Sequence, residues 1–311
     1  MGQLVGGVLL ELQIGGLTWE IIFFVNVPVA ALCLFGIYTN MPAEPLQKQR
    51  LDYGGVLLII STLLCFITPL IYGRTFHWAW WIWGLIGLSF ALLTCFIYYE
   101  RNRERQHQNV VISLQLFKNK SFALHLPIIL FYNFTAGLFI CYPYYLQTHL
   151  QWSVLATGLA IIPYGIGFFL GPILFAKVER SAAFWIPFAL ALLSVSFVSL
   201  GLLFYNFPTP NLLAHGLFFS AGLGHGLIMP VMMKESIRPI TIEQAGQASG
   251  IISTIIQVGS VLGGAILGTL FFSISETQRF PVAFSLALAT IGTVQLLGIG
   301  FYLVNKKNKN I

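Results

Sequence analysis

Long apolar segments alternate with short polar connections along almost the whole chain of 311 residues. A helix that crosses the hydrocarbon core of a bilayer needs about 20 apolar residues, and segments of roughly that length recur throughout. The pattern predicts an all-α fold in which the first membrane-spanning helix is short and nine more follow. We place these helices at residues 3-16, 19-40, 55-73, 79-99, 122-147, 154-176, 183-205, 211-233, 244-273 and 281-304.

The composition of the chain agrees with this pattern. Hydrophobic residues make up 57% of the sequence and charged residues 8%, whereas about a quarter of the residues are charged in a typical soluble domain. We therefore predict a polytopic membrane protein whose main partner is the lipid bilayer.

Basic residues gather in alternate connections between the predicted helices. If successive connections lie on opposite sides of the membrane, all but Arg74 and Arg279 of the 16 Lys and Arg residues fall on the same side. Short loops rich in Lys and Arg stay in the cytoplasm, so we predict a protein of the cell (inner) membrane with a cytoplasmic C-terminus. The net charge of +6 then follows from topology, and it needs no nucleic acid partner.

Two polar stretches, at 42-55 and 100-122, divide the chain into three parts. We interpret residues 42-121 as two linker helices with their cytoplasmic connections. Residues 122-311 then form a C-terminal half of six helices. Residues 1-41 are left as the remnant of an N-terminal half, with the end of a fifth helix and a sixth helix.

A glycine pattern in the first segment returns near the end of the chain. Gly2, Gly6 and Gly7 match Gly259, Gly263 and Gly264. Glycines four residues apart let a neighbouring membrane helix approach closely. Gly259 lies in the fifth helix of the six-helix half. If the two halves are parallel repeats, Gly2 also belongs to a fifth helix, and about four helices that would come before it are absent.

Several segments in order resemble the fourteen-helix drug:proton antiporters of the major facilitator superfamily. Besides the first glycine motif they are TWEIIFFVNVP (18-28), LDYGG (51-55), LQLFKNKSF (114-122), GLAIIPYGIG (158-167), GLGHGLIMP (222-230) and AGQASGIISTIIQVGSVLGGAILGT (245-269). The resemblance covers essentially the whole chain, and it implies a major facilitator fold that lacks about the first four helices.

The same resemblance implies a function and its partners. It implies efflux of hydrophobic or cationic small molecules, with the proton gradient as the energy source and without a cofactor. The proton-coupling residues of the family would lie in the missing helices, so a missing N-terminal half becomes an expected partner of this chain.

His225 is the ionisable residue placed deepest within a predicted helix. An ionisable group at such depth is a functional-site hypothesis by default, and an imidazole suits proton or cation exchange near neutral pH. The alternative is a neutral imidazole that is hydrogen-bonded across a helix interface. Gly222, Gly224 and Gly226 favour this alternative, because they permit close helix contact.

Tyr132, Asn133 and Gln257 are polar residues within apolar helices. Each must find a partner away from lipid, either in a substrate cavity together with His225 or in a hydrogen bond between helices. At the cytoplasmic end of helix 154-176, Lys177, Glu179 and Arg180 act as topology anchors, although in the resembling family such loops are similar to conformational latches.

No motif in the sequence indicates covalent chemistry or a metal site. We find no nucleophile elbow, phosphate-binding loop or metal-ligand spacing, and we therefore expect a protein that is not an enzyme. The alternative function is that of a non-transporting remnant, or of a partner subunit of a split transporter. A membrane-bound enzyme is a third and less favoured hypothesis, because acid-base residues within the predicted helices are scarce.

Overall fold

The computed structural model describes residues 5–9, 19–40, 52–178, 181–276 and 279–307, with side chains up to residue 304. Within these ranges the chain is helical and contains no strand. Nine helical segments there are long and apolar enough to cross a membrane, and they coincide with the predicted spans from 19-40 onward. Most of the predicted span 3-16 lies outside the described residues.

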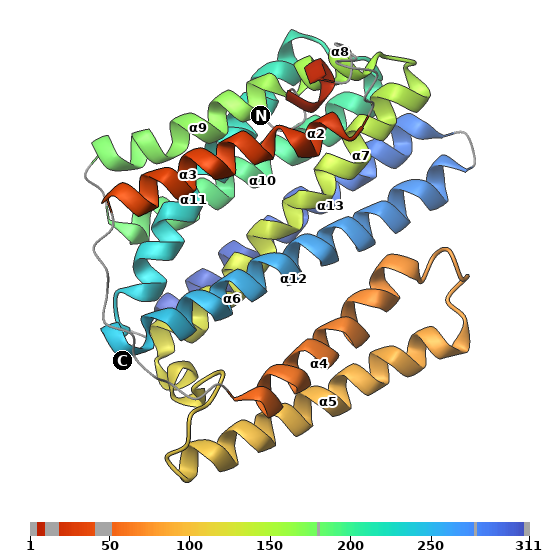
Figure 1. Cartoon of the computed structure of the whole chain (residues 1–311). Helices are drawn as coiled ribbons and strands as arrows, with labels where there is room; N and C mark the ends of the chain where they lie inside the picture. The colour runs from red at the N-terminus through yellow and green to blue at the C-terminus, as the bar shows by residue number, and fades with distance from the viewer. Residues whose placement is uncertain (1–4, 10–18, 41–51, 179–180, 277–278, 308–311) are drawn as a thin grey trace.

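The first helices of the chain follow one another in Figure 1. They are α2 (Ile21–Phe24), α3 (Asn26–Asn40), α4 (Tyr53–Tyr72), α5 (Trp80–Arg105) and the short 3-10 helix η2 (Leu114–Lys118). Helices α4 and α5 pack against each other as an antiparallel pair, which we call the hairpin. Helix α3 contains no buried residue.

Residues 120–307 form a bundle of helices beside the hairpin (Figure 1). Its elements are α6 (Lys120–Asn133), η3 (Phe134–Gly137), α7 (Leu138–Tyr144), η4 (Tyr145–His149), α8 (Val154–Ala160), α9 (Ile162–Lys177), α10 (Ala182–Asn206), α11 (Leu212–Ile237), α12 (Ile242–Ser275) and α13 (Phe280–Lys307). Helix α9 packs along α11, α10 packs against both α11 and α13, and α12 lies on α6 and η3.

Aromatic rings fill one of the two cores of the bundle. The ring of Phe284 stacks on Tyr145 with centroids 4.6 Å apart and on Tyr142 with centroids 5.5 Å apart, and Phe204 meets Phe284 edge-on at 4.9 Å. All four side chains are buried. The second core, around Ile128, is mostly aliphatic. Stacked and edge-on ring pairs add specific geometry to the dispersion contacts that hold membrane helices together.

The predicted span 122-147 is divided in the structure into α6, η3, α7 and η4. Two prolines, Pro127 and Pro143, lie within it, and a proline removes one backbone hydrogen bond of a helix. The 3-10 turn of η3 begins at Phe134, where α12 crosses. The division therefore falls where a second backbone approaches this span most closely.

The hairpin begins with a buried carboxylate. Asp52 caps α4 by accepting a hydrogen bond from the backbone N–H of Gly55 at 3.0 Å. It also accepts one from the hydroxyl of Tyr99 at 3.0 Å and pairs with Arg103 at 3.2 Å. A buried carboxylate is stable only when it is paired or hydrogen-bonded, so this cluster fixes the two helices of the hairpin together at one end.

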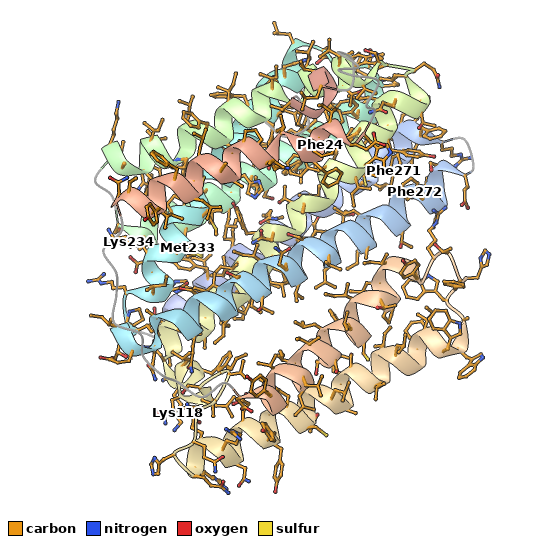
Figure 2. All side chains as sticks on the ribbon, in the orientation of Figure 1. Phe24, Lys118, Met233, Lys234, Phe271 and Phe272 are labelled. Atoms are coloured by element: carbon orange, nitrogen blue, oxygen red, sulfur yellow. The ribbon has the colours of Figure 1, made fainter. Side chains whose placement is uncertain are left out.

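Two lysines and two phenylalanines mark opposite ends of the molecule. Figure 2 shows Lys118 and Lys234 at one end and Phe271 and Phe272 at the other. This arrangement agrees with the predicted gathering of basic residues on one side of a membrane. The assignment of that side to the cytoplasm stays a prediction.

Candidate functional site

The crossing of α9 and α11 brings two backbones into contact. Gly167 and Gly171 lie four residues apart on α9, and Gly222 and Gly226 lie four residues apart on α11. A Cβ atom added to Gly171 would come within 2.5 Å of the backbone of Gly226, and one added to Gly222 would overlap the backbone of Tyr164. Each helix therefore supplies a groove for the other, as small residues do between membrane helices.

Beside this crossing lies a cluster of Tyr132, Tyr164 and His225, which we call the tyrosine–histidine cluster. The hydroxyl of Tyr164 shares a hydrogen bond with Nδ1 of His225. The hydroxyl of Tyr132 donates to the backbone carbonyl oxygen of His225 at 3.0 Å. All three residues are buried, so their polar atoms use one another as partners in place of water.

Aromatic rings enclose the imidazole of His225. The ring of Tyr132 meets it edge-on with centroids 4.3 Å apart, and the ring of Phe168 does so at 5.3 Å. The three helices that carry these rings, α6, α9 and α11, are thus joined at one point. Of the two hypotheses for His225, the geometry matches the hydrogen bond across a helix interface and not an imidazole that lines an open cavity.

Asn133 and Gln257 do not join the cluster. The side-chain amide of Asn133 donates to the carbonyl oxygen of Ile129 in its own helix at 2.8 Å, and Gln257 is exposed on α12. The amide of Asn133 thus bonds within its own helix and not across an interface, and the expectation that Asn133 and Gln257 line a substrate cavity stays a prediction. Gln257 lies on a face of α12 that also exposes Gly250 and Ser253.

A second polar contact between helices was not predicted. Gln295 of α13 is fully buried, and its Nε2 donates to the carbonyl oxygen of Phe131 at 2.9 Å and to Oγ1 of Thr135 at 3.3 Å. A glutamine inside the apolar run TVQLLG was a signal for this contact. Tyr164 was also missed, although it lies three residues before Gly167 and thus on the same helix face.

The repeated glycines lie at two different interfaces. A Cβ atom added to Gly259 would come within 2.6 Å of the carbonyl oxygen of Leu130, and one added to Gly263 would overlap Phe134. Gly264 instead faces the side chain of Ile140. In the first motif, Gly7 faces the backbone of α8 and Gly6 faces Ile22. Gly2 lies outside the described residues.

The predicted cytoplasmic cluster is described only in part. Lys177 is exposed at the end of α9, whereas Glu179 and Arg180 lie outside the described residues. Among the residues that the structure describes, no group of three His, Cys, Asp or Glu side chains could hold a metal ion. The site is thus a set of hydrogen bonds and close packing contacts between helices.

Long apolar helices that meet through glycines and through buried hydrogen bonds define a multi-pass membrane protein. Comparison with known protein families identifies the family of this chain. The model of the Major Facilitator Superfamily matches residues 53–264, which is more than half of the chain. The chain belongs to the Major Facilitator Superfamily.

Curated relatives have names that refer to drugs and antibiotics. The chain is 26% identical over 291 residues to the "Probable actinorhodin transporter" of Streptomyces coelicolor, with 89% of this chain and 49% of the relative covered. It is 26% identical over 307 residues to Multidrug resistance protein 3 of Bacillus subtilis, with 96% and 58% covered. It is 25% identical over 299 residues to the Methylenomycin A resistance protein of Streptomyces coelicolor, with 96% and 61% covered.

The chain spans about half the length of the relatives it matches first. The matched residues therefore correspond to a part of each relative.

Proposed function

We propose that this chain forms part of a membrane transporter that exports hydrophobic or cationic small molecules in exchange for protons. The observation that carries the proposal is the family match over the hairpin and most of the bundle. The names of the relatives, which refer to multidrug resistance and to antibiotics, support the substrate class. The order of the helices supports the fourteen-helix type, because a two-helix hairpin precedes a six-helix bundle.

The proposed mechanism places a substrate cavity between two halves that rock against each other. The bundle of α6 to α13 supplies one half. Its helices are fixed to one another by the glycine crossing and the tyrosine–histidine cluster, so the bundle can move as a rigid body. Helix α3 and residues 5–9 supply only a small part of the facing wall. We therefore propose that transport needs further helices, as the longer relatives have.

The proton-coupling residues belong to those further helices in this proposal. The buried imidazole of His225 already has a partner in Tyr164, and it serves to hold the bundle together. The alternative function is that of a non-transporting remnant or a partner subunit. A reading frame directly upstream of Met1 in the genome that encodes four more helices would favour the transporter over this alternative.

Dye efflux from energised vesicles tests the proposal. Vesicles that contain only the 311-residue chain are compared with vesicles that contain the chain extended upstream by four helices, and with empty vesicles. We expect uncoupler-sensitive efflux only from the extended chain, because a cavity with one wall cannot seal alternately toward each side. Efflux from the 311-residue chain alone would contradict the need for further helices, and its absence from both would contradict transport.

The orientation in the membrane is tested separately by cysteine labelling. The four native cysteines are replaced by serine, and single cysteines are introduced as His107→Cys and Pro208→Cys. An impermeant thiol reagent in intact cells should reach position 208 and not position 107, because the basic connections stay in the cytoplasm. The opposite labelling pattern would overturn the predicted topology.

A further inference from the structure

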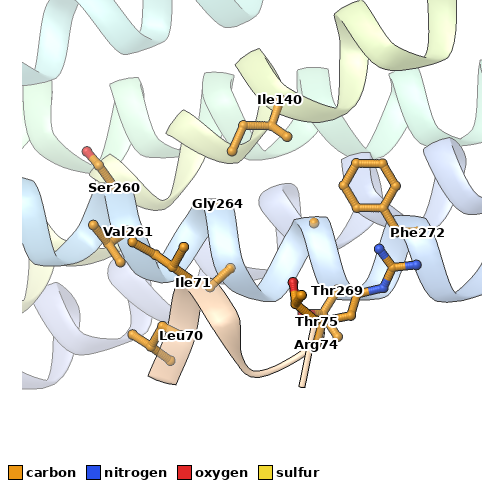
Figure 3. A pocket seen from close by; sticks show the side chains of 12 residues that line it. Leu70, Ile71, Arg74, Thr75, Ile140, Ser260, Val261, Gly264, Thr269 and Phe272 are labelled. Atoms are coloured by element: carbon orange, nitrogen blue, oxygen red, sulfur yellow. The ribbon is translucent and has the colours of Figure 1, made fainter. Parts of the chain in front are cut away.

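A crevice separates the end of the hairpin near Arg74 from α12 (Figure 3). Its volume is about 460 Å3, within the range of about 300–1,000 Å3 that is typical of small-molecule sites. The walls are mostly apolar: Leu70 and Ile71 of α4 face Val261 and Gly264 of α12, with Ile140 of α7 above them. An apolar space of this size between membrane helices is open to a hydrocarbon chain.

Polar residues close the end of the crevice that is remote from Lys118 and Lys234. There Arg74, which follows α4, forms an ion pair with Glu276, which follows α12. The guanidinium of Arg74 also lies over the ring of Phe272, 5.0 Å from its centroid. A second recess of about 480 Å3 begins at this ion pair and continues the crevice. The recess shares Arg74, Thr75 and Thr269 with the crevice and adds His77, Trp78, Ser273 and Glu276.

The two spaces together form an amphipathic site, apolar along α12 and polar at its end. Tryptophans gather beside the polar end, and Trp80 and Trp83 are exposed. Tryptophan is enriched where a membrane meets water, at the depth of the lipid headgroups. The ion pair therefore lies at headgroup depth, and the apolar crevice extends from it toward the middle of the bilayer. A lipid of that leaflet has its head and its tails in this same order.

The charges at the polar end select the headgroup. Arg74 and Glu276 are both accessible, with 38% and 69% of their side chains exposed. A purely anionic headgroup would be repelled by the carboxylate of Glu276, and a purely cationic ligand would be repelled by the guanidinium of Arg74. A head with both charges avoids each repulsion, because its phosphate pairs with Arg74 and its ammonium pairs with Glu276.

We propose that this crevice binds a zwitterionic phospholipid of the phosphatidylethanolamine type from the leaflet opposite the basic connections. One acyl chain lies between α4 and α12, and the headgroup lies on the Arg74–Glu276 ion pair. The bound lipid thereby fills the gap between the hairpin and the bundle. The crevice contains none of Tyr132, Asn133, His225 and Gln257, the residues predicted to line a substrate cavity.

Thermal unfolding of the purified chain in detergent tests the proposal. Lipids with identical acyl chains are added that carry a phosphatidylethanolamine head, an anionic phosphatidylglycerol head or an uncharged head. At saturation we expect phosphatidylethanolamine to raise the unfolding temperature by about 2–4 °C more than the other two. Equal shifts for the three heads would overturn the proposal. So would a larger shift with the lipophilic cation tetraphenylphosphonium, because the site would then be one for cations.

Two sets of variants separate the head from the tail. In the double variant Arg74→Gln/Glu276→Gln, the preference for phosphatidylethanolamine should disappear, while a shift common to all three lipids remains. Ala265→Trp fills the crevice and should remove the shift for every lipid. Ile266→Trp is the matched control, because Ile266 is exposed on the next position of α12 and does not line the crevice. A loss of the lipid shift in Ile266→Trp equal to that in Ala265→Trp would count against the site.

Photocrosslinking in vesicles gives a readout that does not depend on the stability of the variants. A phosphatidylethanolamine with a photoreactive acyl chain should label residues 261–272 of α12 more than α10, whose exposed residues face lipid without a crevice. Ala265→Trp should reduce the label on α12 and leave the label on α10 unchanged. Even labelling of the two helices in the native sequence would contradict a specific site.

Discussion

Glycines at the helix crossings of the bundle and glycines of the hairpin helix α5 have opposite surroundings. In the bundle, glycines such as Gly222, Gly226 and Gly263 lie against the backbone of another helix. In the hairpin, Gly84 and Gly87 of α5 have no atom of another residue within 4 Å of the place where a Cβ would lie. A glycine in a membrane helix therefore indicates close packing only where a second helix crosses it. The bundle is held by such crossings along its helices, and the hairpin meets the bundle mainly at its ends.

The largest effect expected from this comparison concerns the crossing of α9 and α11. Gly226→Leu places a side chain where the backbone of Phe168 lies. We expect it to lower the free energy of unfolding by about 3 kcal/mol or more, because overpacking typically costs about 1–3 kcal/mol. Gly84→Leu in the hairpin is the matched control, and it should change the free energy of unfolding by less than about 0.5 kcal/mol. Thermal unfolding in detergent measures both. Similar losses in the two variants would remove the contrast between bundle and hairpin.

The second prediction sharpens the comparison within one helix. Gly263→Leu should push η3 away from α12 and lower the free energy of unfolding by about 1–3 kcal/mol. Gly250→Leu lies on the same helix at a position with open space around it, and it should change stability little. An unchanged unfolding temperature in Gly263→Leu would show that η3 and α12 are not in close contact.

The tyrosine–histidine cluster should have an effect toward the lower end of the same range, because one hydroxyl is lost and no helix is pushed away. Tyr164→Phe removes the hydroxyl that partners the buried imidazole of His225 and should cost about 1–3 kcal/mol, the usual penalty for an unsatisfied buried polar group. His215→Phe serves as the control, because His215 is only partly buried on the same helix as His225. If Tyr164→Phe is neutral while Gly226→Leu is strongly destabilising, close packing alone holds this crossing.

The smallest effect is expected where the connection between α5 and η2 meets the other end of α12. Gln247 accepts a hydrogen bond from the N–H of Ser113 at 3.2 Å and donates one to the carbonyl oxygen of Val110 at 3.1 Å. Gln247→Ala should cost about 0.5–1.5 kcal/mol. Its main result should be faster amide hydrogen exchange at Ser113, because the N–H of Ser113 then loses its partner. Gln257→Ala, at an exposed position of the same helix, should leave that exchange unchanged.

The positions of the helices could be predicted from the sequence, because the length of an apolar run is a local property. The predicted span 183-205, for example, is α10, Ala182–Asn206. The internal division of the span 122-147 could not be predicted, because it coincides with the crossing of α12. Pro127 and Pro143 were visible in the sequence, but membrane helices often contain proline without such a division.

The candidate site was predicted only in part for the same reason. Tyr132 and His225 stand out in the sequence as polar residues in apolar helices, and the structure brings them together, whereas a role in lining a substrate cavity stays a prediction. Their partner Tyr164 was hidden, because a tyrosine next to Pro163 gives no sign of which helix it faces. Asn133 shows the limit of the method. Its side-chain amide bonds to a carbonyl of its own helix, so its polarity does not indicate a hydrogen bond to another helix.

The carboxylate of Asp52 has a consequence for the biosynthesis of the chain. The partners that fix it, Gly55, Tyr99 and Arg103, all belong to the hairpin or its capping turn. The two helices can therefore pair the buried carboxylate of Asp52 as soon as both have left the ribosome, before α6 has been made. We expect the translocon to release α4 and α5 into lipid as a pair, and a gene segment that encodes such a self-sufficient pair could be moved as a unit between proteins.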